Sequence, residues 1–537
     1  MATDHTHVKA YLVGGGIASL SAAAFLIKDG GISGKNIFIY EEQDRAGGSV
    51  EAQGNPEKGY LIHGGRMFEE TYNCTYELLS FIPSLADSTR TAKQEILEFH
   101  QDFVWNGKGR LVEGGRPIDV SSLGFGARDR LDLTELFAIP EDLIGKKSID
   151  DWFKASFFKT NFWYMWATTF AFEPWHSVVE FKRYLMRYVH LFSAEEKVAG
   201  VYRTQYNQYD TIIRPVVRWL AERGVNFEMG CKVTDIDFKA GDKEKTVQKI
   251  FYTQDGKNQS VEISDNDLVF VTNGSMSADI SVGGMDRAPI LKSSRGNNGW
   301  TLWERLSKKF NDFGNPAAFN SNTYQTKWES FTVTSTSPLF FDLVEKFSGH
   351  EAGEGGLVTI KDSNWLLTLV LNHQPHFYEQ PDDVWVWWGY GLMPDKEGNF
   401  IHKKMSDCSG REILTEVMSH FRFMAEIPDV VNHSICLPCM MPYIGSQFMP
   451  REKGDRPLVV PKGSTNFSFI GQYCEMPKEV VFTLEYSVRS AQTAVYQLLK
   501  LDKEVSPIKT AQDVGTLFNV VKTMNRGPKK IEPEQRV

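Results

Sequence analysis

The sequence predicts an α/β protein organised around a parallel sheet. Residues 8–13 are a short apolar run typical of a buried strand, and Gly14–Ser19 follow as a G-x-G-x-x-S turn. The Ala-rich stretch 20–28 predicts a helix, and residues 36–40 predict a second strand that ends at Glu41. A strand, a glycine turn, a helix and a strand in this order form a Rossmann-like βαβ unit.

The glycine turn predicts a dinucleotide-binding site. Gly14 permits the tight turn, Gly16 lets the backbone approach a pyrophosphate at the helix N-terminus, and Ser19 takes the third, small position. Glu41 stands about 20 residues further on, where an acidic residue accepts hydrogen bonds from a ribose. The alternative is a tight βα turn that binds nothing. The predicted cofactor contacts of this unit also include Ile17, Ala18 and Glu42.

The residues after the second strand favour one dinucleotide. Glu41-x-x-x-Arg45-x-Gly47-Gly48 resembles the extension of two-dinucleotide-binding-domain flavoproteins, in which the arginine and the glycines cover the FAD pyrophosphate. NAD-binding folds do not usually carry this extension. The resemblance therefore implies FAD rather than NAD as the cofactor.

Later strands complete the predicted sheet. The apolar run 268–272 leads into Asn273-Gly274, and residues 467–470 lead into Gly471 and a helix at 481–499. In flavoproteins of this class, such a strand–glycine–helix places backbone N–H groups at the flavin ring or ribityl chain. Further predicted elements are strands at 225–229 and 233–238 and helices at 68–81 and 211–223.

The predicted architecture is a discontinuous FAD-binding Rossmann-like domain, with an inserted α+β substrate domain and a short helical C-terminal tail. At 537 residues the chain is too long for one simple core and suggests two or three units. The FAD-binding domain is assigned to residues 1–75, 195–290 and 455–500, the substrate domain to 76–194 and 291–454, and the tail to 501–537.

Composition narrows the class of protein. Hydrophobic residues make up 42% and charged residues 24%, which is ordinary for a globular chain. The net charge of −9 argues against a nucleic-acid partner. No apolar run approaches the roughly 18 residues that span a bilayer. The first residues lack the features of a signal peptide, so the cytoplasm is the expected compartment.

Six cysteines do not form a disulfide framework in a chain of this length. Cys436-Leu437-Pro438-Cys439 is a C-x-x-C pair, but no second pair accompanies it in the sequence. A pair of buried thiols is favoured over a redox site, and no metal site is predicted.

Aromatic residues form 13% of the chain and concentrate in residues 157–191. Aromatic side chains on every helical face indicate either burial all round or the lining of an apolar cavity. Both interpretations stay open for this region. A second aromatic stretch, 384–390, predicts a strand.

Further motifs along the chain are Gly64-Gly65-Arg66, Asn161-Phe162-Trp163, Phe170-Ala171-Phe172-Glu173, Trp175-His176-Ser177, Glu180-Phe181-x-Arg183-Tyr184, Tyr206-Asn207-Gln208-Tyr209, Gln374-Pro375-His376-Phe377 and Phe448-Met449-Pro450-Arg451. Together with the dinucleotide motif, they resemble the oleate hydratase family, once called the myosin-cross-reactive antigens, over about residues 8–500. The family adds water across a cis double bond of an unsaturated fatty acid, and oleic acid gives 10-hydroxystearic acid. It requires FAD, although no net redox change occurs. Gly64, Gly65 and Arg66 are implied cofactor contacts.

The resemblance also implies two catalytic roles. An isolated alkene is a poor base, so an acid must deliver a proton while water attacks the other carbon. The family's proton-donating tyrosine matches Tyr184. Its water-activating glutamate follows Gly-Gly-Arg, where this chain has Met67, and a thioether cannot accept a proton from water.

Three substitutes for that glutamate are hypothesised: Glu69, Glu70, or the reduced flavin with backbone groups. An extended segment would place Glu69 on the side of Met67, and a helix would place Glu70 there. The alternative is that both glutamates are solvated surface charges.

The fatty acid's carboxylate must be fixed so that the double bond is correctly placed. Asn372 and His376 match the family's carboxylate-binding residues, and Val370 stands where the family has a threonine. The expected partner is therefore an unsaturated fatty acid such as oleic acid. The short tail favours a monomer or a weak homodimer, and leaves transient, peripheral membrane contact during lipid loading open.

Three rival hypotheses share these motifs. A flavin oxidoreductase, such as an amine oxidase or a carotenoid desaturase, carries the same nucleotide signature. A fatty-acid double-bond isomerase needs the same pocket. A catalytically idle, FAD-bound lipid carrier would follow from loss of the glutamate at Met67.

Overall fold

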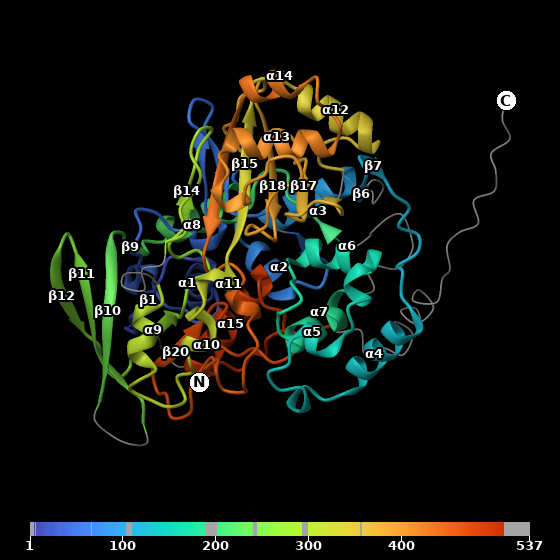
Figure 1. Ribbon diagram of the computed structural model, residues 1–537. Helices are drawn as coiled ribbons and strands as arrows, with labels where there is room; N and C mark the ends of the chain where they lie inside the picture. Colours follow the sequence, from blue (N-terminus) through green and yellow to red (C-terminus); the bar gives the residue numbers. More distant parts are fainter. Residues whose placement is uncertain are drawn as a thin grey trace.

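A computed structural model describes residue 5 and residues 7–65, 67–103, 110–189, 201–239, 244–292, 299–354 and 357–509. Two large sheets form its framework, with helices between and around them (Figure 1). Arg66, predicted to contact the cofactor, lies outside the described residues, as does the predicted tail beyond residue 509.

The first sheet confirms the Rossmann-like prediction. Its five strands are all parallel, in the order β20-β13-β1-β2-β9. Three buried alanines on helix α1 (Ile17–Lys28), at positions 22–24, allow close packing beside helix α15 (Leu484–Leu498). The strands are β1 (Ala10–Val13), β2 (Ile37–Tyr40), β9 (Asn226–Glu228), β13 (Leu268–Thr272) and β20 (Phe467–Ile470).

The second sheet has eight strands in the order β14-β19-β15-β18-β17-β16-β6-β7. Its strands are β6 (Leu111–Glu113), β7 (Arg116–Pro117), β14 (Ser281–Val282), β15 (Trp328–Ser335), β16 (Val358–Ile360), β17 (Leu367–Val370), β18 (Trp385–Gly391) and β19 (Ser434–Met441). Strand β14 joins this sheet although it falls within the segment 195–290 assigned to the FAD-binding domain, and the domain boundaries stay a prediction.

The two faces of the second sheet are covered differently. Helices α12 (Leu339–Ser348), α13 (Gly410–His420) and α14 (Ile427–Asn432) lie together at the top of Figure 1 and cover one face. The hairpin of β3 (Ala52–Asn55) and β4 (Gly59–Ile62) packs on the other face. There the N–H groups of Tyr60 and Ile62 donate to the hydroxyls of Thr334 (2.8 Å) and Thr332 (3.1 Å).

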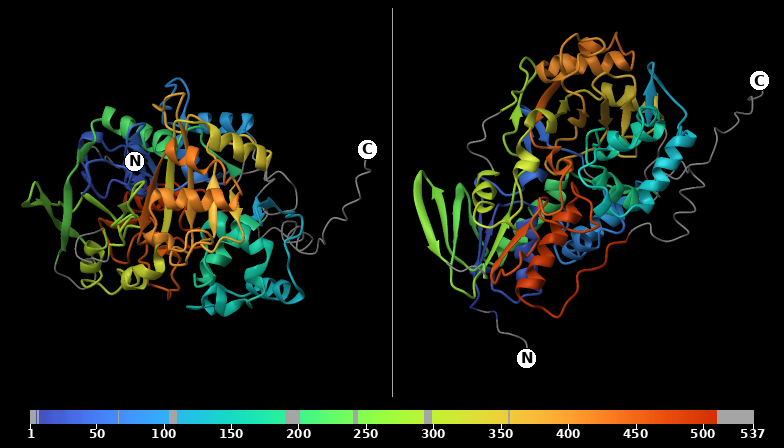
Figure 2. Two further views of the ribbon diagram at one scale, coloured as in Figure 1. Left: turned by 45° about the horizontal axis from the view of Figure 1, so that its top comes forward. Right: turned by 60° about the horizontal axis from the view of Figure 1, so that its bottom comes forward.

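A third sheet, β10-β11-β12, is antiparallel and projects from the body of the protein (Figure 2). Its strands are β10 (Cys231–Phe238), β11 (Val247–Gln254) and β12 (Lys257–Glu262). The remaining helices are α2 (Asn73–Leu79), α3 (Ala92–Asp102), α4 (Ala127–Ala138), α5 (Ile149–Trp152), α6 (Asn161–Phe170), α7 (Val178–Tyr188), α8 (Arg214–Glu222), α9 (Thr301–Leu306), α10 (Ala317–Asn320) and α11 (Thr323–Thr326).

Two predicted helices begin differently in the structure. The helix predicted over 68–81 was wrong at its start, because β5 (Phe68–Glu69) pairs with β8 (Val201–Tyr202) before α2 begins. Tertiary strand pairing overrides the local helical periodicity here. The predicted helix 211–223 opens with a π-helical segment, Tyr209–Ile213, that continues into α8.

The described part of the aromatic region, residues 157–189, is built mainly into the core. Helices α6 and α7 stack their rings on one another, as in the Phe172–Tyr184 pair with centroids 4.9 Å apart. The cysteine prediction is confirmed, since Cys436 and Cys439 are free and fully buried in β19. Among the described residues, no helix is both long and apolar enough to cross a bilayer.

Strand β15 holds a buried acid on the face under α13. Glu329 is 0% exposed, and within the described part of the chain neither carboxylate oxygen has a hydrogen-bond partner. Burial, with a smaller contribution from Asp407, raises the pKa of Glu329 well above its ordinary value. The folded protein therefore holds the Glu329 proton to a higher pH than an exposed glutamate would.

We expect Glu329→Met to raise the free energy of unfolding at neutral pH by about 1–3 kcal/mol, because it removes an unsatisfied polar group. The unfolded chain releases the Glu329 proton above about pH 4.3, whereas the fold retains it. The contribution of Glu329 to wild-type stability should thus fall as pH rises from there, and the gain from Glu329→Met should grow over the same range. Urea unfolding across pH measures this, with exposed Glu262→Met as control. A gain independent of pH would contradict it.

Candidate functional site

A cavity opens at the carboxyl ends of the parallel strands, around the turn between β1 and α1. Gly14 has φ +96°, a conformation that favours glycine, and a Cβ there would lie 3.2 Å from Thr272 Cβ. Nothing lies within 4 Å of a Cβ built at Gly16, so a ligand can approach this backbone closely. Helix α1 has no side-chain cap and no acidic residue in its first turn. The turn therefore fits an anionic diphosphate.

Glu41 stands at the end of β2 beside this turn. Its Oε2 accepts from the Gly15 N–H at 2.5 Å and its Oε1 from the Gln43 N–H at 2.8 Å. Burial raises the pKa of Glu41, while these two bonds oppose the shift. The neighbouring Glu42 pairs with Lys232 Nζ at 2.8 Å on the cavity wall.

The predicted pyrophosphate cover folds back on the glycine turn. Gly47 N–H donates to the Gly15 carbonyl at 3.0 Å, and a Cβ at Gly48 would lie 3.2 Å from Gly16 Cα. Arg45 lines the cavity, and its Nε lies 2.8 Å from Glu51 Oε1. Arg45, Gly47 and Gly48 therefore lie next to the turn that would bind a diphosphate.

The predicted cofactor residues divide into three groups. Those that line this cavity are Gly14, Gly16, Ala18, Glu41, Glu42, Arg45, Gly48, Gly274 and Gly471. Ile17, Ser19, Gly47 and Asn273 lie behind the lining: Ser19 Oγ is 3.2 Å from Thr272 Oγ1, and Asn273 Nδ2 donates to the Tyr473 carbonyl at 3.0 Å. Gly64 and Gly65 line a second cavity instead.

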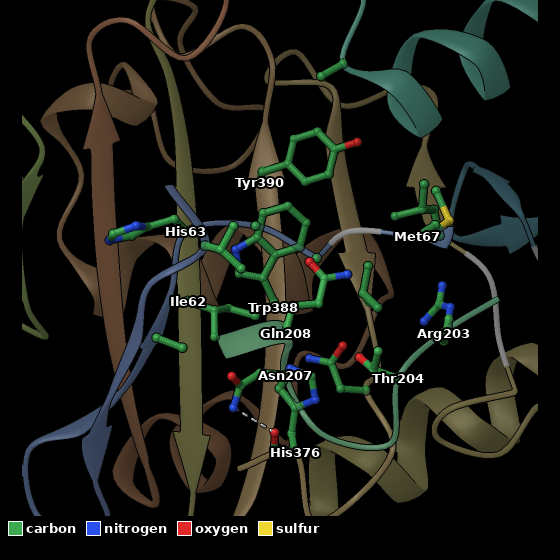
Figure 3. Close-up of a pocket in the computed structure, with 18 of the residues that line it drawn as sticks. Ile62, His63, Met67, Arg203, Thr204, Asn207, Gln208, His376, Trp388 and Tyr390 are labelled. Atoms are coloured by element: carbon green, nitrogen blue, oxygen red, sulfur yellow. Dashed lines mark hydrogen bonds between the residues drawn. The ribbon is translucent and has the colours of Figure 1, made fainter. Parts of the chain in front are cut away.

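The second cavity is largely apolar and lies between the β3–β4 hairpin and the eight-stranded sheet. It has about 1110 Å³ of atom-free space, open solvent included. Trp388 and Tyr390 lie side by side on its wall, with Met67 and Arg203 to one side and His63 to the other (Figure 3). Ser49, Glu51 and His63 line both cavities, so these three residues mark their junction.

Polar side chains gather on one part of the apolar cavity. Asn372, His373, His376 and Arg203 all line it. Among the described atoms, Asn372 Nδ2 and His376 Nδ1 have no hydrogen-bond partner despite their burial. Burial, with His373 and Arg203 nearby, lowers the pKa of His376 to about 3, and burial lowers the pKa of Arg203 to about 10. At neutral pH Arg203 is the cation of this group, and the group suits a carboxylate.

The structure separates the three residues predicted around the missing glutamate. Met67 lines the apolar cavity. The segment is extended, and Glu69 is buried outside the lining, where its Oε2 accepts from the Thr71 N–H at 3.0 Å and from the Thr71 hydroxyl. Glu70 is exposed and faces a different surface hollow. Neither glutamate lies in the wall of the apolar cavity.

Tyr184 is buried on α7, behind the wall of the apolar cavity. Its hydroxyl donates to the Val481 carbonyl at 2.5 Å. The next residue, Phe482, lines the cavity and has φ +68°, an uncommon conformation for a residue with a side chain. The acceptor of the Tyr184 hydroxyl, Val481, is thus the immediate neighbour in sequence of a residue of the cavity wall.

Sequence reasoning missed several wall residues. Glu51, Arg203 and Tyr390 line the cavity, but they lie far apart in the sequence. Arg203 precedes the Tyr206–Tyr209 motif, which is a signal that could have pointed to it. Glu51 follows the Gly47-Gly48 pair, yet nothing in the local pattern shows that this position, just before β3, lies in the wall of a second cavity.

The chain is similar to known sequences along most of its length. The model of the MCRA family matches residues 7–496. A protein named oleate hydratase from Streptococcus pyogenes serotype M49 (strain NZ131) is 36% identical over 530 residues, covering 96% of this chain and 89% of the relative. A protein named linoleate hydratase from Lactiplantibacillus plantarum is 31% identical over 562 residues, covering 96% and 98%.

Among solved structures, cyclohexylamine oxidase from Brevibacterium oxydans IH-35A is similar with a TM-score of 0.52. Its sequence identity is 12%, and the match covers 92% of this chain and 99% of that one. At this identity the likeness concerns the fold alone.

Proposed function

The chain belongs to the MCRA family, and on this premise we propose that it is a fatty acid hydratase acting on oleic acid. The reaction adds water across the cis-9 double bond and gives 10-hydroxystearic acid, without net redox change. The observation that carries the proposal is the apolar cavity, which has polar side chains suited to a carboxylate in its wall and meets the dinucleotide cavity at Ser49, Glu51 and His63.

FAD is the proposed dinucleotide. The Gly14–Gly16 turn and the N-terminus of α1 would hold its diphosphate, Arg45 would cover it, and Glu41 would face the ribose. Gly274 and Gly471 line the same cavity from the ends of β13 and β20. When bound, a reduced flavin supplies electron density next to the developing positive charge of the substrate.

Asn372 and His376 are the proposed partners of the substrate carboxylate. Their unsatisfied nitrogen atoms gain an acceptor when a carboxylate enters the cavity. Val370, which also lines the cavity, cannot add the hydrogen bond that a threonine would make. The fatty-acid chain then lies against apolar wall residues such as Trp388 and Leu357.

Tyr184 is the proposed general acid. It would deliver a proton to one alkene carbon while water attacks the other. To do so, the Tyr184 hydroxyl must leave the Val481 carbonyl. Phe482, the residue after Val481, forms part of the wall of the apolar cavity. Exclusion of bulk water by the aromatic wall strengthens the electrostatic stabilisation of the cation.

Anaerobic incubation with oleic acid, FAD and a reductant in heavy-oxygen water tests this function. Mass spectrometry should find a product heavier than oleic acid by one labelled water. A product of unchanged mass with a shifted double bond would instead indicate an isomerase, and binding of oleate without a product would indicate a carrier. Flavin bleaching by substrate in a matched vial without reductant would indicate an oxidoreductase.

A further inference from the structure

We propose that Glu51 is the carboxylate that accepts the proton of the attacking water. This inference rests on the proposed hydratase function. Glu51 would activate the water in place of the family's glutamate, whose position is occupied by Met67 in this chain. The inference is drawn from the position of Glu51 at the junction of the two cavities.

Glu51 places a carboxylate, which can accept a proton, in the wall of the apolar cavity. Among the described residues that line the apolar cavity, it carries the only carboxylate. The same side chain lines the dinucleotide cavity, so it faces the region where substrate and cofactor would meet. The side chain is 22% exposed, which lets a water molecule reach it.

The other carboxylates near this region, those of Glu41, Glu69 and Glu70, lie outside the lining of the apolar cavity. Glu69 accepts two hydrogen bonds from Thr71 outside the lining, and Glu70 is exposed. Glu41 accepts from Gly15 and Gln43 in the dinucleotide cavity alone. Glu51 is therefore the carboxylate that can contact both a water and an alkene.

Arg45 holds Glu51 in position and tunes it. The two side chains form an ion pair with Nε and Oε1 2.8 Å apart, and Arg45 also donates to the Gln53 side chain. Burial raises the pKa of Glu51, and Arg45 limits the rise. The carboxylate keeps capacity to accept a proton, because an ionised carboxylate offers about four lone-pair sites and this ion pair, between Nε and Oε1, uses one of them.

The step balances as a simple hydration. Water oxygen forms the new C–O bond while one O–H bond breaks and its proton passes to Glu51. The acid supplies the proton of the new C–H bond at the other carbon. Solvent then returns a proton from Glu51 to the acid's conjugate base, so the net change is the addition of one water to one double bond.

Comparison of the FAD-loaded wild type with Glu51→Gln tests the proposal. The expected result is that kcat for oleate hydration at saturating FAD falls about 100-fold or more, while the Kd for oleate stays unchanged. Glu57→Gln is the matched control: it is the same substitution six residues further on, but Glu57 is exposed in the β3–β4 turn and lies outside both cavity linings. That variant should keep the wild-type kcat.

Several results would overturn the proposal. An unchanged kcat in Glu51→Gln would contradict it. A decrease in turnover that disappears at saturating FAD would also contradict it. Glu51→Ala with added formate gives a further readout, because a small carboxylate should restore turnover only if a proton acceptor is missing. If Glu51→Gln does not fold, Glu51→Asp keeps the charge opposite Arg45. Its withdrawn carboxylate should lower kcat about 10- to 100-fold, and an unchanged kcat would count against the role.

Failure of the inference is distinguishable from failure of the proposed function. If the wild type incorporates no heavy oxygen into oleate, the hydratase function itself is wrong. If the wild type hydrates oleate and the Glu51 variants do so equally well, the function stands and another group activates the water.

Discussion

Replacing Tyr184 by phenylalanine is expected to slow oleate hydration by about 10²- to 10⁴-fold, the usual contribution of a general acid. The substitution removes one hydroxyl and keeps the ring in its cluster with Phe170 and Phe172. The Kd for oleate should stay unchanged, because Tyr184 lies behind the cavity wall rather than in it. Initial rates of 10-hydroxystearic acid formation, with binding measured separately, check this result.

Tyr188→Phe is the matched control for that experiment. Tyr188 lies one turn further along α7, is equally buried, and its hydroxyl is 2.8 Å from the Tyr72 hydroxyl. The control loses a buried hydrogen bond but keeps the Tyr188 ring packed against Tyr184, with centroids 5.5 Å apart, and it should hydrate oleate at the wild-type rate. Equal rates in Tyr184→Phe and the wild type would assign the proton to another donor, of which Tyr390 in the cavity wall is the first to examine.

Glu180→Gln is expected to destabilise the fold by about 3–5 kcal/mol. Glu180 is fully buried on α7, and its Oε1 accepts from Arg456 Nη1 at 2.7 Å and from Arg451 Nη2 at 3.2 Å. Burial opposes its charge, but Arg456, Arg451 and Arg183 outweigh it and lower the pKa of Glu180 to about 2. The glutamine keeps the shape but removes the Glu180 charge from these buried arginines, of which Arg183 and Arg451 still pair with Glu475. Urea midpoints measure the loss.

The pH dependence of that variant follows from the same pKa shift. Because the pKa of Glu180 is lower in the fold, its stabilising effect is present above the ordinary glutamate pKa and is lost as pH falls towards 2. The two proteins should therefore approach equal stability in acid.

Glu141→Gln serves as the control for Glu180→Gln. Glu141 pairs with Arg183 at 2.9 Å, but its side chain is 33% exposed, and such pairs contribute about 1 kcal/mol or less. Similar losses in the two variants would show that burial of the network adds nothing.

Much of the dinucleotide-binding half was predictable because its signals are local. A strand, a glycine turn and a helix within Val8–Lys28 are close in sequence and also in space, and β1, α1 and β2 appear where periodicity predicted them. The start of the predicted helix over 68–81 failed for the opposite reason. Phe68 and Glu69 form a strand with partners more than a hundred residues away, which no local window reveals.

The apolar cavity was predictable only in part. Motif resemblance pointed to Met67, Asn372 and His376, and all three line it. Glu51 reaches the same wall through the β3–β4 hairpin, whose placement depends on hydrogen bonds from Tyr60 and Ile62 to the eight-stranded sheet. This packing depends on groups from both the hairpin and the sheet, so the local sequence of neither segment predicts it.

Strands β15 and β18 present alternate side chains to two different environments. Trp328, Trp388 and Tyr390 line the apolar cavity, whereas Phe331, Val333 and Trp387 pack into the core beneath α13. Successive residues of a strand point to opposite faces, so the determinants of substrate shape and of stability are interleaved along the same few residues. Substitutions can then enlarge or shorten the proposed lipid cavity at alternate positions, while the intervening positions keep their packing in the core.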